Sequence, residues 1–174
     1  RYLFEDALIK QIKRALKAVD GHFVITKESG RIYVDAEGEY DYDETLDALK
    51  RVFGIVWICP MVQFEDRDYE NIKKQIVAYM DEVYPDKHLT FKVNARRGDK
   101  SYPHMSEEIN RDMGEVILNA FPETKVDVHH PDVMLHIEVR KKVNVYSLMI
   151  PGAGGMPVGT NGKAMRLLSG GIDS

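Results

Sequence analysis

The stretch LTFKVNARR, residues 89–97, decides how the middle of this chain folds. Phe91, Val93 and Ala95 alternate with polar residues, which is the period of a β-strand with one buried face. Two consecutive arginines end the stretch, and further basic residues follow it. We therefore predict a β-strand that leads directly into the most basic part of the sequence.

Amphipathic helices are predicted on both sides of this strand. Residues 68–84 repeat apolar side chains at three-to-four spacing, and residues 106–121 begin with a serine and stop before a proline. Three short strand-like segments follow between residues 125 and 150. This order mixes crossover connections with hairpins and predicts a small α+β unit.

The first sixty residues predict a second α+β unit. An amphipathic helix over residues 1–19 precedes two strand-like segments joined by a Gly-containing turn. A second helix is expected to begin with Asp43 or Thr45 as its N-cap, and Pro60 favours an edge or a bulge in the strand over residues 55–64. A ferredoxin-like domain of the split βαβ type has one more strand at its start, so we expect that strand to be missing.

The composition favours a cytoplasmic protein without a membrane partner. Of the 174 residues 44% are hydrophobic and 30% charged, and no apolar run approaches the roughly 18 residues of a membrane span. No signal peptide is visible, and a single cysteine cannot form an internal disulfide. We interpret Cys59 as a buried hydrophobe and expect no metal site, taking His129, His130 and His136 as ordinary strand residues.

Charge is segregated along the sequence. The net charge of −4 by itself argues against a nucleic-acid partner. Residues 35–47, however, hold seven acids and no Lys or Arg, whereas residues 87–105 hold five basic residues and one acid. Taken alone, the basic stretch is more typical of a solvated charged loop than of an RNA site, although Tyr102 and His104 add rings that can stack on bases.

The chain ends on MRLLSGGIDS, residues 165–174. A short apolar run that leads into paired glycines is typical of a buried strand followed by a phosphate-binding turn. The alternative is a polar Gly/Ser tail that happens to follow an apolar run. The Walker pattern is absent. The string SGGIDS resembles the PP-loop of ATP pyrophosphatases, a family in which this loop holds the pyrophosphate end of ATP while a substrate is adenylated.

A longer set of motifs resembles the tRNA 4-thiouridine synthase family, which also serves in thiamine thiazole formation. The motifs, in the order that family shows, are FGI at 53–55, the basic strand already quoted, VDVHHPD at 126–132, HIEVR at 136–140 and the Gly-rich string from Gly152 to Met165. The resemblance covers essentially the whole chain.

The resemblance implies an α+β fold in three parts. An N-terminal ferredoxin-like domain without its first strand would occupy residues 1–60, and a THUMP RNA-binding domain residues 61–150, with an alternative start near residue 45. Residues 151–174 would form a Gly-rich linker and the first loop of an α/β PP-loop ATP pyrophosphatase domain. Both ends of the chain are therefore expected to be cut.

The resemblance also implies an enzymatic role for the whole protein. The family uses ATP and Mg²⁺ to adenylate uridine 8 of tRNA, and sulfur relayed from a cysteine desulfurase or another persulfide donor replaces the activated oxygen. A homodimer is the oligomeric state it suggests. No catalytic residue is expected in this piece, so the fragment alone should be inactive.

Two groups of site residues follow from the resemblance. The residues expected to contact ATP are Leu167, Leu168, Ser169, Gly170, Gly171, Asp173 and Ser174. The residues expected to contact the tRNA acceptor region are Lys92, Arg96, Arg97, Lys100, Tyr102, His104, Arg140 and Lys141. With a THUMP domain in place, the basic stretch favours RNA binding over the solvated loop.

Two alternative functions stay open from the sequence. One is an RNA-binding THUMP module of another tRNA-modifying enzyme, such as a methyltransferase, for which a G-x-G-type cofactor loop is expected in place of SGGIDS. The other is a PP-loop ligase that acts on a small molecule. The basic, aromatic-containing stretch and two additional N-terminal domains argue against that ligase.

Overall fold

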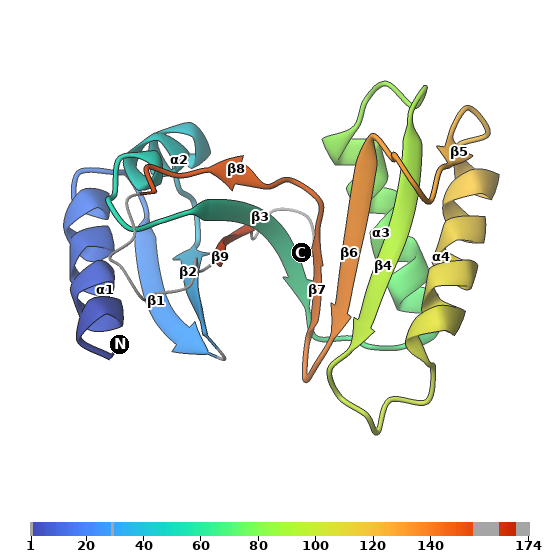
Figure 1. The fold of residues 1–174 in the computed structure, drawn as a ribbon, viewed down its shortest axis with the longest axis horizontal. Helices are drawn as coiled ribbons and strands as arrows, with labels where there is room; N and C mark the ends of the chain where they lie inside the picture. Colours follow the sequence, from blue (N-terminus) through green and yellow to red (C-terminus); the bar gives the residue numbers. More distant parts are fainter. Residues whose placement is uncertain (1, 29, 155–163, 170–174) are drawn as a thin grey trace. The chain divides into compact units, whose positions relative to one another are not determined.

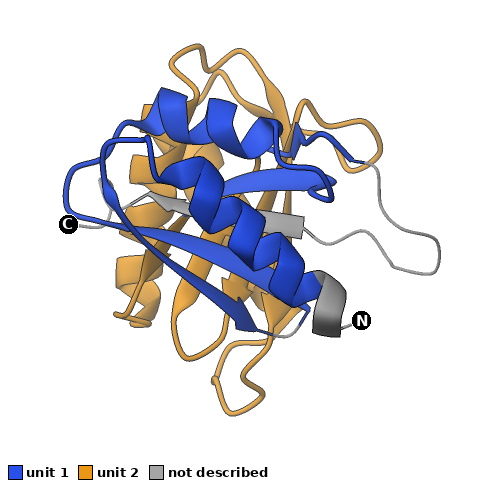
Figure 2. Ribbon diagram, turned by 90° about the vertical axis from the view of Figure 1, so that its left-hand side faces the viewer, with its two compact units in different colours: residues 1–61, 148–170 blue, residues 62–147, 171–174 orange. Residues whose placement is uncertain are grey.

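The structure, a computed structural model, describes residues 2–28, 30–154 and 164–169. The chain divides into two compact units, shown in different colours in Figure 2. Unit 1 comprises residues 1–61 and 148–170, and unit 2 comprises residues 62–147 and 171–174. No helix within the described ranges is long and apolar enough to cross a membrane.

Unit 1 consists of two helices and a sheet. Its elements are α1 (Tyr2–Leu16), β1 (His22–Glu28), β2 (Arg31–Glu37), α2 (Tyr42–Lys50), the first part of β3 (Trp57–Phe64), β8 (Ile150–Pro151) and β9 (Ala164–Ser169). β1 and β2 form an antiparallel hairpin in which Glu28 pairs with Arg31, and Gly30 adopts a φ of 77° in the turn. β9 pairs with β2 in parallel.

The core of unit 1 lies between α1, α2 and the sheet. Leu8, Ile12 and Leu16 of α1 are buried, as the spacing predicts, together with Leu49 of α2 and Val34 of β2. Burial of these side chains against the strands supplies the hydrophobic free energy that holds both helices.

The second helix begins earlier than predicted. Asp41 is its N-cap, and the Asp41 carboxylate accepts a hydrogen bond from the N–H of Glu44 at 3.0 Å. The expected caps, Asp43 and Thr45, lie inside α2. Asp41 is the N-cap because its backbone is extended, with a φ of −87° and a ψ of 105°, as an N-cap requires.

Unit 2 packs two helices on one face of a sheet (Figure 1). Its elements are α3 (Tyr69–Val83), β4 (Thr90–Arg97), α4 (Ser106–Ala120), β5 (Lys125–Val126), β6 (Val133–Val139) and β7 (Val143–Tyr146). The strand order is β7-β6-β4-β5. β4 runs parallel to both β5 and β6, whereas β7 is antiparallel to β6. These elements confirm the α+β class predicted from the sequence.

Alternation along β4 sets the two faces of this sheet. Phe91, Val93 and Ala95 point into the core with the apolar faces of α3 and α4, whereas Lys92 and Asn94 are only half-buried. The strand predicted over residues 89–97 is thus confirmed. Cys59, in β3, is buried as expected.

Candidate nucleic-acid interface

Three arginines lie at one end of the unit 2 sheet. Arg96 and Arg97 are the last residues of β4, and Arg140 directly follows β6. β4 and β6 are parallel neighbours in which Arg96 is opposite Glu138 and Arg97 opposite Val139. The two strands therefore end side by side, at the lower end of unit 2 in Figure 1. Their carboxyl ends bring the arginines to the same end of the sheet.

These arginines surround a pocket of about 340 Å³, here called the arginine pocket. It is lined by Arg96, Arg97, Gly98, Ser106, Glu138 and Arg140. The one carboxylate in this wall, Glu138, is buried and accepts a hydrogen bond from the Tyr146 hydroxyl at 2.9 Å. Guanidinium groups are permanently charged and carry planar sets of donors that match phosphate oxygens. The arginine pocket is therefore suited to a phosphate group.

Side chains of α4 hold the end of β4 in place. β5 pairs only with the first two residues of β4, so the rest of that edge needs other partners. The Ser106 hydroxyl accepts from the N–H of Arg97 at 3.1 Å, and the Asn110 side chain accepts from the N–H of Ala95 at 2.7 Å. Ser106 also begins α4, so the partial positive charge of the helix N-terminus lies beside the pocket.

Arg67 lies beside the arginine pocket and bonds to two of the segments next to it. Its Nη1 donates to Asp99 Oδ2 and to the carbonyl oxygen of Arg140, both at 2.7 Å. The Tyr102 hydroxyl donates to the Arg67 carbonyl at 2.7 Å, and the guanidinium carbon lies 5.4 Å from the centroid of that ring. One side chain thus ties the β3–α3 connection to the β4–α4 loop and to the β6–β7 turn.

Asp99 is held as an anion within this network. Hydrogen bonds from Ser101, together with the one from Arg67, lower the pKa of Asp99 to about 2. Its own N–H donates to the carbonyl oxygen of Val139 at 3.0 Å. The loop after β4 is therefore anchored to the end of β6 by both backbone and side chain.

The two arginines of β4 keep most of their donors available. Within the described part of the chain, neither Arg96 nor Arg97 forms an ion pair. Arg96 is exposed, whereas Arg97 is half-buried and donates through Nη1 to the carbonyl oxygen of Tyr102 at 3.0 Å. A guanidinium has five N–H donors, so this single bond leaves Arg97 able to bind an anion.

The two rings predicted to stack on RNA bases are engaged within unit 2. Tyr102 is 5% exposed and packs in the hydrophobic core, which leaves little of its ring available for stacking on a base. His104 is half-buried and stacks on Tyr69 with ring centroids 3.7 Å apart. Its Nδ1 lies 2.9 Å from Glu108 Oε2, and this hydrogen bond lowers the pKa of Glu108.

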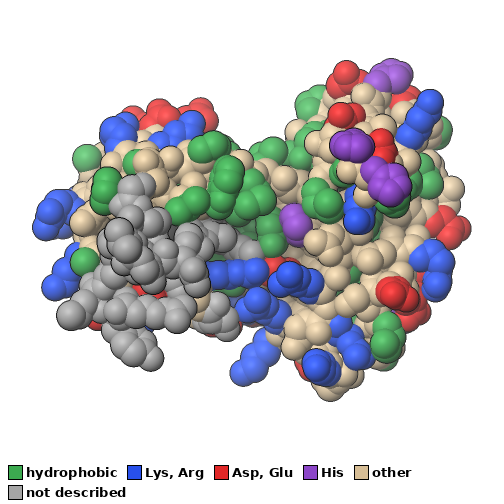
Figure 3. Space-filling model, viewed as in Figure 1, with side chains coloured by type: hydrophobic (Ala, Val, Ile, Leu, Met, Phe, Trp, Pro, Cys, Tyr) green, Lys and Arg blue, Asp and Glu red, His purple; other side chains and the backbone are tan. Residues whose placement is uncertain are grey.

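The remaining predicted basic residues do not line the arginine pocket. Lys100 and Lys141 are exposed, and Lys92 is half-buried within β4. On the face drawn in Figure 3, Lys and Arg side chains gather over the lower part of unit 2, where β4 and β6 finish. Lys141 belongs to a turn in which the N–H of Arg140 donates to the carbonyl oxygen of Lys142 at 2.9 Å.

Sequence reasoning missed Arg67, Asp99 and Ser106 as parts of this site. The spacing Asp-x-Ser at residues 99–101 is a local turn signal, and a serine at a helix start is a familiar one. Arg67 gives no such signal, because its partners are more than thirty residues away along the chain.

The residues expected to contact ATP are described only in part. Leu167, Leu168 and Ser169 belong to β9, in which Leu167 pairs with Val34 of β2. Gly170, Gly171, Asp173 and Ser174 lie outside the described residues. In this structure β9 is part of unit 1.

Comparison with known families identifies both units. The model of the ThiI ferredoxin-like domain matches residues 1–59, and the THUMP domain model matches residues 66–148. A probable tRNA sulfurtransferase of Agathobacter rectalis is 58% identical over all of this chain and 44% of its own length. The chain thus spans less than half of that relative.

Two solved structures share the fold. The protein PH1313 of Pyrococcus horikoshii is 33% identical, with a TM-score of 0.72 over 91% of this chain and 52% of its own. A 4-thiouridine synthetase solved as an RNA complex with bound ATP is 31% identical, with a TM-score of 0.72 over 91% of this chain and 39% of its own. From its motifs, its two units and these matches, the chain belongs to the tRNA sulfurtransferase family, of which it carries the ThiI ferredoxin-like domain and the THUMP domain.

Proposed function

We propose that this chain is the tRNA-binding part of a tRNA sulfurtransferase that converts uridine 8 of tRNA to 4-thiouridine. The arginine pocket is the observation that carries the proposal. It gathers three cations at one edge of unit 2, in a chain whose net charge is −4. A tRNA is a polyanion, and its acceptor region offers both paired backbone and unpaired bases.

The RNA-contacting residues in this proposal are Arg96, Arg97 and Arg140 at the pocket, together with Lys92, Lys100 and Lys141 of the same unit. His104 stays part of the proposal, although one face of its ring already stacks on Tyr69. Arg67 and Asp99 act indirectly, because their hydrogen bonds hold the loop and the turn that carry the contacting side chains. A preset arrangement lowers the entropy lost when RNA binds.

The chemistry proposed for the whole protein follows the family. It would use ATP, with Mg²⁺, to activate the uridine, and a cysteine desulfurase or another persulfide donor would supply the sulfur. The solved relative with bound ATP supports the nucleotide. The residues that would contribute to that ATP site are Leu167, Leu168, Ser169, Gly170, Gly171, Asp173 and Ser174. The whole protein would also supply sulfur for thiamine biosynthesis, form a homodimer and act in the cytoplasm.

The domain boundaries proposed earlier remain part of this assignment. Residues 1–60 would be the ferredoxin-like domain, 61–150 the THUMP domain and 151–174 the linker with the start of the catalytic domain. By itself the chain would bind tRNA without modifying it.

Filter binding of tRNA over a series of salt concentrations tests the proposal. Arg96→Ala and Arg97→Ala should each weaken binding by roughly tenfold, since a charge-assisted hydrogen bond is worth about 1.5 kcal/mol. Lys74→Ala, which removes an exposed cation from α3 outside the pocket, is the control and should bind like the unchanged chain. If all three variants bind tRNA equally well, the RNA site is not here.

A further inference from the structure

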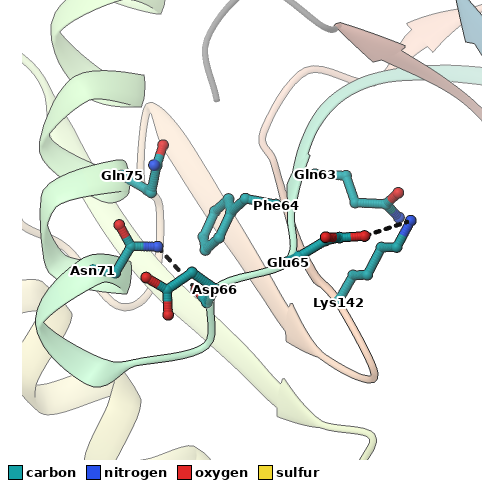
Figure 4. Close-up of a pocket in the computed structure, with 7 residues that line it drawn as sticks. All are labelled: Gln63, Phe64, Glu65, Asp66, Asn71, Gln75 and Lys142. Atoms are coloured by element: carbon teal, nitrogen blue, oxygen red, sulfur yellow. Dashed lines mark hydrogen bonds and ion pairs between the residues drawn. The ribbon is translucent and has the colours of Figure 1, made fainter. Parts of the chain in front are cut away.

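Unit 2 has a second pocket, of about 500 Å³, whose lining residues are drawn in Figure 4. It is lined by Gln63, Phe64, Glu65, Asp66, Asn71, Gln75 and Lys142. Its volume lies within the range of about 300–1,000 Å³ that is usual for small-molecule sites. None of these residues is needed for the phosphate contacts proposed above.

Hydrogen bonds within the wall determine what this pocket offers a ligand. Gln63 already donates through Nε2 to Asn144 at 2.8 Å, and Asn71 donates through Nδ2 to the carbonyl oxygen of Asp66 at 2.9 Å. In the described part of the chain, the side-chain oxygens of Gln63 and Asn71 accept no hydrogen bond. Both amide oxygens are therefore available as acceptors.

Two carboxylates add to these acceptors. Asp66 and Glu65 are exposed, and Glu65 lies 3.7 Å from the Lys142 ammonium group at the rim. Negative charge on both residues disfavours a phosphate inside the pocket, whereas it favours a group that carries N–H donors. Phe64 also lines the pocket, although its side chain is 5% exposed and packs mainly in the hydrophobic core.

A nucleobase with an exocyclic amine has the chemistry that this wall requires. Adenine, cytosine and guanine each carry an amino group that donates to carboxylate or amide oxygens, whereas uracil presents two carbonyl oxygens and a single ring N–H. No group of three or more His, Cys, Asp or Glu side chains in the described ranges is placed to hold a metal ion, so a cation site is not favoured.

The β6–β7 turn connects this pocket to the arginine pocket. Arg140 lines one pocket and Lys142, two residues later, lines the other. A backbone hydrogen bond between Arg140 and Lys142 fixes the turn, and the Arg67 side chain donates to the carbonyl oxygen of Arg140. A single strand whose phosphate lies against Arg140 would thus have a neighbouring base within reach of the second pocket.

We propose that the pocket lined by Gln63, Glu65, Asp66, Asn71 and Gln75 takes an unpaired, amine-bearing base of the RNA whose phosphates bind the arginine pocket. The inference rests on the proposed RNA binding and adds base preference to it. The arginines supply affinity for any sequence, and the acceptor-lined pocket distinguishes amine-bearing bases from uracil.

The test compares oligoadenylate and oligouridylate of equal length, titrated into the 174-residue chain by fluorescence anisotropy. The unchanged chain should bind the adenylate at least about fivefold more tightly, since one good base contact is worth a factor of this size or more. Gln75→Ala and Glu65→Gln should reduce this ratio toward one. Gln75 is half-buried in mid-helix and Glu65 is exposed, so both variants should fold.

Two controls separate this inference from the proposed function. Glu123→Gln removes an equal charge at an exposed site outside the pocket and should leave the ratio unchanged. Arg96→Ala should weaken both oligonucleotides equally. If the ratio survives Gln75→Ala and Glu65→Gln while Arg96→Ala still weakens binding, the base pocket is wrong and the RNA site stands. A ratio of adenylate to uridylate affinity near one in the unchanged chain also overturns the base pocket. That result is expected if the pocket takes a basic protein side chain instead of a base. Loss of all binding overturns the proposed function itself.

Discussion

Units 1 and 2 each contain a strongly charged segment, but the fold uses the two charges differently. In unit 1, Asp41 of the acidic run caps α2 and Asp43 and Glu44 occupy its first turn, where they interact favourably with the helix dipole. In unit 2, Arg96 and Arg97 end a strand beside a pocket and keep most of their donors. A charged run therefore indicates a ligand only where the fold leaves its hydrogen bonds available.

The largest effect is expected when all three pocket arginines are replaced. Arg96→Ala, Arg97→Ala and Arg140→Ala together should weaken tRNA binding by about 1,000-fold at low salt, from ~1.5 kcal/mol per arginine. The slope of log affinity against log salt should fall by about two, because three phosphate contacts are lost. Urea unfolding should show that the variant still folds. An unchanged slope would mean that these arginines contact no phosphate.

Arg67→Ala should weaken tRNA binding by a smaller factor, roughly threefold to tenfold. Arg67 holds Asp99 and the carbonyl oxygen of Arg140, so its loss releases the loop and the turn without removing a phosphate contact. The salt slope should therefore stay the same, and Arg67→Lys should restore part of the affinity. A slope that falls by about one would instead identify Arg67 as a contact residue.

Asp41→Ala should act only on unit 1. Loss of an N-cap aspartate lowers the free energy of unfolding by about 1 kcal/mol. The single tryptophan, Trp57, lies in unit 1, and its fluorescence during urea unfolding reports the change. Asp47→Ala, at an exposed mid-helix position, should leave stability equal or slightly higher. Weaker tRNA binding by Asp41→Ala under native conditions would contradict the division of roles between the units.

The smallest effect is expected in the acid stability of unit 2. The pKa of Asp99, about 2 in the fold, lies below the value of about 3.9 for an unfolded aspartate. A lowered pKa stabilises the fold above pH ~4, and this contribution is lost as the pH falls from about 4 to about 2. Asp99→Asn should thus have a lower free energy of unfolding than the unchanged chain at pH 7. Between about pH 4 and about pH 2 it should lose less of that free energy than the unchanged chain does. Urea midpoints at successive pH values measure this, and parallel curves for the two proteins would contradict it.

Local pattern predicted most elements of the fold. The helices α3 and α4 and the strand β4 agree with the predicted ranges to within one or two residues, because each shows a clean apolar period. The N-cap of α2 was misplaced by two or four residues, since several neighbouring side chains can each cap and only backbone geometry selects one. β8, a two-residue strand, has no period long enough to detect.

Sequence by itself determined the family, the α+β class and the position of the cations along the chain, because these depend on local period and on contiguous motifs. The meeting of Arg140 with Arg96 and Arg97 was decided only by the tertiary structure, through the parallel register of β4 and β6. Burial likewise removed Tyr102 from the surface, and long-range hydrogen bonds placed Arg67 beside the arginine pocket. Such contacts join residues far apart in the chain, and no local period encodes which distant side chain fills a given space.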